Sequence, residues 1–263
     1  MTPRSLRQLL LVVILTLLGI GVVAVYSASA MISEVNYGGS VRFVSHHLVA
    51  IACGLALSLG CLMIPYATLR RSAKWLLLVS LVLLVLVAVF GQEVGGAKRW
   101  FRIGRLSLQP SEFAQLSLVL YLADLLARRV DRLQDFWRGL LPPLLATGIT
   151  AGLVLIQPDL GTTIVMGAVA LLLLGIARAR WQHLAGIVVL AGIVLVFLIA
   201  GEEYRRRRIL AFLDPWADPR GSGYQILQSY FALASGGLTG LGVGGSLQKL
   251  FFLPSAHTDF IFA

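Results

Sequence analysis

Long apolar runs separated by short polar segments recur along the first 200 residues of the chain. Because a helix rises about 1.5 Å per residue, about 20 apolar residues cross the ~30 Å hydrocarbon core of a bilayer. The pattern predicts membrane-spanning helices at Gln8 to Ala30, His47 to Ile64, Trp75 to Phe90, Glu112 to Ala127, Leu140 to Ile156, Thr162 to Ala177 and His183 to Ala200. The predicted fold class is therefore an all-α polytopic membrane protein.

The fourth apolar run contains more polar residues than the others, among them Glu112, Gln115 and Asp124. If all seven runs cross and the N-terminus is cytoplasmic, the short inner segments carry eleven lysines and arginines and the short outer loops carry five. If the fourth run does not cross, the two counts are exchanged. Because short cytoplasmic loops are enriched in lysine and arginine, the charge distribution favours seven spans.

This topology divides the chain into a seven-span domain, residues 1–200, and an extracytoplasmic loop, residues 201–263, that ends at the start of a further helix. The amphipathic segment from Tyr224 to Ser235 predicts a helix lying on the outer membrane surface. The loop opens with four arginines, Arg205 to Arg208, which as an alternative are an ordinary cytoplasmic anchor. Long loops are translocated largely regardless of their charge, so an outer position is compatible with these residues.

Composition supports a membrane protein and excludes a soluble domain. Hydrophobic residues make up 58% of the chain and charged residues 13%, whereas soluble proteins carry about 25% charged residues. The net charge is +10, but the basic residues lie between apolar spans, which favours anionic lipid head groups over nucleic acid as partner. Cys53 and Cys61 are eight residues apart on one predicted helix, about 12 Å, which is too far for a disulfide.

Basic residues gather in two predicted outer segments, around Lys98 and Arg99 and at Arg205, Arg206, Arg207 and Arg208. Positive charge on the outer side has no topological explanation and suggests a ligand that is a phosphate-bearing lipid. For the first segment an interfacial anchor built with Trp100 and Phe101 is the alternative.

Two aspartates are candidates for chemistry. Asp159 lies in a short outer turn, where a carboxylate at membrane depth faces a polar cavity or a cation, or simply caps the next helix. His257 and Asp259 precede an apolar segment at the end of the chain. A partly buried aspartate there could act as a general base, and helix capping by Thr258 and Asp259 is the alternative. No cluster of His, Cys and acidic residues has the spacing of a structural zinc site.

Six motifs occur in an order that resembles the SEDS family of bacterial envelope proteins, named for shape, elongation, division and sporulation. They are Gly-Ala-Lys-Arg-Trp at 96–100, Gln-Pro-Ser-Glu at 109–112, Gln-Pro-Asp-Leu-Gly-Thr at 157–162, Asp-Pro…Asp-Pro at 214–219, Gly-Tyr-Gln at 223–225, and Leu-Pro-Ser-Ala-His-Thr-Asp-Phe-Ile-Phe-Ala at 253–263. The sequences at residues 245–250 and around Asp259 resemble the FtsW-like, cell-division branch more than the RodA-like branch.

The resemblance implies a ten-helix fold, of which seven spans are present, and a glycosyltransferase that polymerises lipid II on the outer face of the bacterial inner membrane. It implies Asp259 as the catalytic base, and a class B penicillin-binding transpeptidase and other divisome or elongasome membrane proteins as partners. Lys98, Arg99 and the arginines from Arg205 to Arg208 are expected to stabilise the leaving pyrophosphate. The other expected substrate-binding residues are Glu112, Asp159 and His257.

The chain departs from the family pattern in two ways, and other functions stay open. Gln115 and Ser107 stand where family members usually carry a lysine and often an arginine. The chain ends at Ala263 where the family continues, so we expect that this polypeptide alone does not turn over substrate. A divalent cation could assist the leaving group, although no ligand set is visible. A lipid II flippase and a non-catalytic scaffold for the transpeptidase are the alternative functions.

Overall fold

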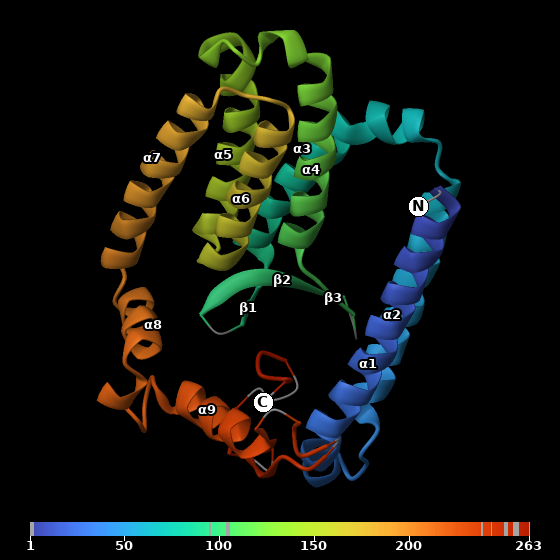
Figure 1. Ribbon diagram of the computed structural model, residues 1–263, viewed down its shortest axis with the longest axis vertical. Helices are drawn as coiled ribbons and strands as arrows, with labels where there is room; N and C mark the ends of the chain where they lie inside the picture. The colour runs from blue at the N-terminus through green and yellow to red at the C-terminus, as the bar shows by residue number, and fades with distance from the viewer. Residues whose placement is uncertain are drawn as a thin grey trace. The chain divides into compact units, whose positions relative to one another are not determined.

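The computed structural model describes residues 3–94, 96–103, 106–237, 239–242, 244–249, 252–254 and 258–262 (Figure 1). The chain forms two compact units, which are described separately. The terminal unit combines Met1–Met63 with Val196–Ala263, and the central unit is Ile64–Leu195.

The terminal unit begins with two long apolar helices, α1 (Pro3–Tyr37) and α2 (Arg42–Met63), which pack against each other. Helix α7 (Trp181–Ala200) enters this unit with its last residues and is followed by α8 (Glu203–Leu213) and α9 (Tyr224–Gly236). Two short 3₁₀ helices, Pro215–Ala217 and Leu247–Lys249, lie in the connecting segments. The predicted helix at 224–235 thus coincides with α9.

The central unit is a bundle of α3 (Tyr66–Phe90), α4 (Pro110–Arg128), α5 (Leu141–Ile156) and α6 (Leu160–Ile176), whose helices lie side by side in Figure 1. A 3₁₀ helix at Val130–Arg132 and a π-helical turn at Phe136–Leu140 connect α4 to α5. Its core contains large apolar side chains from all four helices: Leu77, Leu84, Leu118, Leu122, Val154 and Met166. Contacts between these helices therefore bury part of the apolar side chains of four of the predicted runs.

A small antiparallel sheet lies at one end of the bundle, with the strand order β1 (Gln92–Val94), β2 (Ala97–Ile103) and β3 (Leu106–Leu108). The sequence predicted only a loop in this region. Gly96 has φ +79°, in the left-handed region that glycine accepts without a steric penalty, and it occupies the turn between β1 and β2. Gly96 therefore permits the tight connection between these two antiparallel strands.

Helices occupy all seven of the predicted apolar runs, and the polytopic membrane architecture is confirmed. By length and composition, five segments of the described chain are long and apolar enough to cross a membrane: Arg4–Val35, Arg42–Met63, Tyr66–Phe90, Phe136–Ile156 and Trp181–Ala200. Leu160–Ile176 is apolar but shorter, and α4 is not among the candidates. The number of crossings and the division at residue 200 remain predictions.

Asp124 of α4 has two arginine partners. Asp124, whose side chain is 13% exposed, accepts a hydrogen bond from Arg70 Nε of α3 at 2.6 Å and pairs with Arg128 at 2.7 Å. Ser111 and Ser117 of the same helix are buried. The charge of Asp124 is therefore balanced by Arg70 of α3 and Arg128 of α4 itself. Among the described residues, no hydrogen-bond partner is found for the hydroxyl groups of Ser111 and Ser117.

Candidate functional site

Asp259 lies in the terminal unit, in a run of turns at residues 258–262, and its side chain is exposed. Two contacts attach this part of the chain to its surroundings. Gln225 of α9 donates from Nε2 to the carbonyl oxygen of Pro254 at 3.0 Å. Lys249 donates from Nζ to the carbonyl oxygen of Ile261 at 3.4 Å. Because its side chain is exposed, the carboxylate of Asp259 is accessible. The two hydrogen bonds link backbone carbonyls on either side of Asp259 in the sequence to α9 and to the 3₁₀ helix at Leu247–Lys249.

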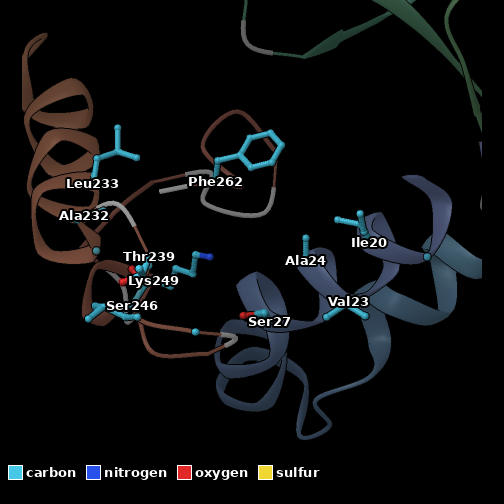
Figure 2. Close-up of a pocket in the computed structure, with 16 residues that line it drawn as sticks. Ile20, Val23, Ala24, Ser27, Ala232, Leu233, Thr239, Ser246, Lys249 and Phe262 are labelled. Atoms are coloured by element: carbon cyan, nitrogen blue, oxygen red, sulfur yellow. The ribbon is translucent and has the colours of Figure 1, made fainter. Parts of the chain in front are cut away.

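A cavity of about 710 Å³ opens in the same unit. Its lining residues come from α1, from the end of α9, from the glycine-rich loop after α9 and from the segment that carries Asp259: Gly19, Ile20, Val23, Ala24, Ser27, Ala232, Leu233, Gly236, Gly237, Thr239, Gly240, Leu241, Gly242, Ser246, Lys249 and Phe262 (Figure 2). Ser27 accepts a hydrogen bond from the Gly244 N–H at 2.9 Å, which joins α1 to the glycine-rich loop. Sequence reasoning did not single out Lys249 or Ser27, because neither lies in a motif that it associated with chemistry.

The four arginines of α8 do not act as one cluster. Each residue of an α-helix is rotated by about 100° from the one before, so Arg205 to Arg208 project around most of the helix circumference. Arg205 donates from Nη1 to the carbonyl oxygen of Leu198 at the end of α7, at 2.8 Å. Arg207 pairs with Glu203 one turn earlier at 2.5 Å. Arg206 and Arg208 are exposed and lie on different sides of the helix.

Arg99 of β2 caps the end of α5 in the central unit. Its Nε donates to the carbonyl oxygen of Gln157 at 2.8 Å, and its Nη2 donates to the carbonyl oxygen of Pro158. Gln157 is itself 3% exposed and donates from Nε2 to the carbonyl oxygen of Leu84 in α3 at 3.1 Å. The last carbonyls of a helix have no partner within the helix, so a guanidinium at that place satisfies them and faces the negative end of the helix dipole.

Lys98 is exposed and stands opposite Glu93 in the antiparallel register of β1 and β2. Successive side chains on a strand point to opposite faces, so Lys98 and Arg99 are directed away from each other. The two residues therefore do not form a joint cationic site on one face of the hairpin.

Asp159 caps α6. Its Oδ1 accepts the backbone N–H of Thr162 at 3.1 Å, and its Oδ2 accepts the hydroxyl of Thr162 at 3.0 Å. This is the capping alternative that the sequence left open, and a role in substrate binding stays a prediction. Glu112 is exposed in the first turn of α4, where its charge suits the positive end of the helix.

His257 lies outside the residues that the structure describes. Within the described part of the chain, no three His, Cys, Asp or Glu side chains are grouped so that they could hold a metal ion. Asp259 thus lies in the same unit as the cavity and three residues before Phe262, which lines it, whereas Lys98, Arg99, Glu112 and Asp159 lie in the other unit.

Comparison with known proteins is consistent across sequence and structure. The family model described as "Cell cycle protein", for FtsW, RodA and SpoVE, matches residues 7–263. Proteins called "Probable peptidoglycan glycosyltransferase FtsW" from Thiomicrospira cyclica and Aliivibrio salmonicida are 41% and 45% identical, over 99% and 98% of this chain and 67% and 64% of their own lengths. The homologue from Pseudoalteromonas atlantica is 42% identical over 97% of this chain and 52% of its own length.

Two solved structures share the fold. One, described as "Structural coordination of polymerization and crosslinking by a peptidoglycan synthase complex", has a TM-score of 0.62 and 34% identity, covering 83% of this chain and 65% of that chain. Rod shape determining protein RodA from Thermus thermophilus has a TM-score of 0.51 and 26% identity, covering 87% of each chain. Taken with its helices and the order of its motifs, the match along nearly the whole sequence means that this chain belongs to the FtsW/RodA/SpoVE family of multi-pass inner-membrane proteins.

Proposed function

We propose that this chain belongs to a peptidoglycan glycosyltransferase that polymerises lipid II at the outer face of the cytoplasmic membrane during cell division. The observation that carries the proposal is the identity of 41% and 45%, along nearly the whole chain, to relatives called peptidoglycan glycosyltransferases. The chain spans 52% to 67% of the length of the three relatives compared above. The activity is therefore a proposal for the whole protein.

The proposed catalytic residue is Asp259. Its carboxylate takes the proton of the acceptor sugar's 4-hydroxyl as that oxygen attacks the anomeric carbon of the lipid-linked donor. The bond from the anomeric carbon to the donor's pyrophosphate oxygen breaks, and polyprenyl pyrophosphate leaves with the electron pair. The exposure of Asp259 supports this role, because a base must be reachable by the hydroxyl that it deprotonates.

Cationic groups stabilise the negative charge that develops on the leaving pyrophosphate. Arg99 and Arg205 already donate to backbone carbonyls, and Arg207 pairs with Glu203. Among the arginines and lysines predicted for this role, Lys98, Arg206 and Arg208 are exposed, which makes them the more available candidates. A divalent cation, if it takes part, would be held mainly by the pyrophosphate oxygens.

We also propose a transpeptidase of the class B penicillin-binding type as partner. The support is the fold shared with a protein from a peptidoglycan synthase complex that couples polymerisation and crosslinking. Co-purification of the full-length protein with its candidate transpeptidase from the native membrane tests this, and separate elution of the two proteins in mild detergent would contradict it.

The catalytic proposal is tested with one substitution and a matched control. Asp259→Asn in the full-length protein should abolish polymerisation of lipid II in a reconstituted assay, with unchanged expression. Asp214→Asn makes the same change in the same loop; Asp214 caps a 3₁₀ helix, and asparagine is an equally good cap, so activity should be retained. If Asp259→Asn retains activity, Asp259 is not the base. If the unsubstituted protein moves lipid II across vesicles without polymerising it, the flippase alternative is correct.

A further inference from the structure

We infer that the cavity around Lys249 binds the pyrophosphate head group and the first isoprene units of a polyprenyl-pyrophosphate lipid. The inference deepens the proposed function and rests on it for the kind of lipid. It adds Lys249 as a binding residue beside the segment that carries Asp259.

The cavity has a polar end and an apolar wall. Figure 2 shows Thr239, Ser246 and Lys249 together on one side, across from residues of α1. The apolar lining includes Ile20, Val23, Ala24, Leu233 and Phe262. Its volume of about 710 Å³ lies within the range of about 300–1,000 Å³ that is usual for small-ligand sites. A cavity with one cationic end and an apolar wall matches an amphiphile whose charged group is an anion.

Lys249 carries the charge at the polar end. The hydrogen bond recorded for its ammonium is the long one to the Ile261 carbonyl, at 3.4 Å. Across the described residues, no carboxylate forms an ion pair with it. Burial lowers the pKa of Lys249, which means that its charged form has lost hydration without gaining a counter-charge. An anion entering the cavity supplies that counter-charge.

The glycine-rich loop leaves the backbone open to a ligand on this side. Gly237, Gly240 and Gly242 line the cavity and have φ values of +55°, +73° and +82°. Residues with side chains rarely adopt these conformations, so glycine is favoured at these three positions, which themselves place no side chain over the main chain. A phosphate can therefore approach the backbone as well as Lys249, Thr239 and Ser246.

The wall from α1 favours a lipid over a free phosphate. The lining residues Ile20 and Val23 are 55% and 49% exposed, so they offer an apolar surface that an apolar chain can contact and a free phosphate cannot. They lie in the second half of α1, which the predicted topology directs toward the outer surface. An isoprenoid tail along α1 would leave the pyrophosphate beside Lys249, whose ammonium contacts the segment that carries Asp259 through the carbonyl oxygen of Ile261.

The first test measures binding without any turnover. The full-length protein in detergent is titrated with a polyprenyl pyrophosphate and the complex is quantified by native mass spectrometry. Loss of a hydrogen-bonded charge should weaken binding by about tenfold or more in Lys249→Met, while Lys249→Arg keeps most of it. Lys74→Met removes the same charge from an exposed position on α3 and should bind as the unsubstituted protein does. Equal binding by Lys249→Met and Lys74→Met overturns the inference.

A steric variant separates a cavity effect from misfolding at Lys249. Ala24→Leu narrows the cavity without changing charge, and it should weaken binding of the polyprenyl pyrophosphate while leaving the thermal midpoint nearly unchanged. Unaltered binding by this variant would contradict occupation of the cavity.

Further probes identify the source of the phosphate. Phosphatidylglycerol and inorganic pyrophosphate should each bind more weakly than the polyprenyl pyrophosphate and depend less on Ala24. If phosphatidylglycerol binds equally well, the cavity is a general anionic-lipid site and the inference fails. Because binding is measured apart from polymerisation, a failed activity test at Asp259 and a failed binding test at Lys249 are distinguishable.

Discussion

Arg99 provides the sharpest test of whether a residue predicted to bind phosphate instead stabilises the fold. Its guanidinium donates to two carbonyl oxygens at the end of α5, those of Gln157 and Pro158. A lysine at this position keeps the positive charge but cannot make both bonds with the same planar group. The variant Arg99→Lys therefore separates the geometric contribution of the side chain from its charge.

The expected magnitude follows from these two bonds. Hydrogen bonds from charged groups contribute about 1.5–3 kcal/mol each to stability, and the lower end applies because one of the two bonds is solvent-exposed. If lysine recovers one contact, Arg99→Lys should lower the free energy of unfolding by about 1–2 kcal/mol, a shift of roughly 2–8 °C in thermal midpoint for a chain of this size. Lys98→Arg, at the exposed neighbouring position, should change it by less than about 0.5 kcal/mol.

The assay is thermal unfolding of the purified protein in detergent, followed by tryptophan fluorescence, together with lipid II polymerisation at a temperature well below the midpoint. A scaffold role predicts lower stability for Arg99→Lys with substantial activity at low temperature. Unchanged stability with lost activity would refute the scaffold reasoning and assign Arg99 to the substrate.

Three further predictions concern polar groups with defined partners. Asp159→Ala should cost about 1 kcal/mol through loss of the α6 cap, measured as a lower thermal midpoint, and Asp159→Ser should restore most of it; a serine variant that is stable but inactive would instead favour substrate binding. Asp124→Asn should lower stability by about 1–3 kcal/mol, because it weakens contacts to Arg70 and Arg128 around a side chain that is 13% exposed, and equal midpoints would contradict this. The backbone N–H and hydroxyl of Ser222, with the N–H of Gly221, hold the pKa of Asp218 below its ordinary value of 3.8. The charged form is thus favoured by folding, so this local stability is complete above that ordinary value and is lost as the pH falls through the lower folded pKa. Hydrogen exchange of the Gly221 and Ser222 amides, corrected for the intrinsic pH dependence, should show protection at neutral pH that is lost in strong acid and is absent at every pH in Asp218→Ala.

The helices were predictable because their cause is local. A run of about 20 apolar residues must satisfy its own backbone hydrogen bonds in a bilayer, and only a helix does this within one segment. Each predicted run is found in a helix, including the diluted run at α4. The three-stranded sheet is not predicted by the sequence, because β1 and β3 have only three residues each and such short strands carry little periodicity.

The candidate site was predictable in part. Asp259 is predicted from its place before an apolar segment and from a family motif; the sequence suggests a partly buried carboxylate, whereas its side chain is exposed, and its catalytic role stays a prediction. Adjacency in the sequence predicts one cluster for the arginines of α8, whereas the geometry of the helix directs their side chains to different sides. Lys249 lies in the segment 245–250 that helps to indicate the FtsW-like branch, but its sequence context indicates no chemical role for it; the cavity that it lines also requires α1, which is more than two hundred residues earlier.

The sequence by itself determined that this is a polytopic membrane protein of the FtsW/RodA/SpoVE family, because apolar runs and ordered motifs are properties of the linear chain. Only the tertiary structure decided which polar side chains form hydrogen bonds within the protein and which are free to bind a ligand. Arg99 satisfies the end of a helix 58 residues away, and Lys249 lines a cavity that exists only when α1, α9 and the glycine-rich loop come together. The hydrogen bonds and burial of a side chain depend on neighbours that are distant in sequence, and folding alone brings those neighbours into contact.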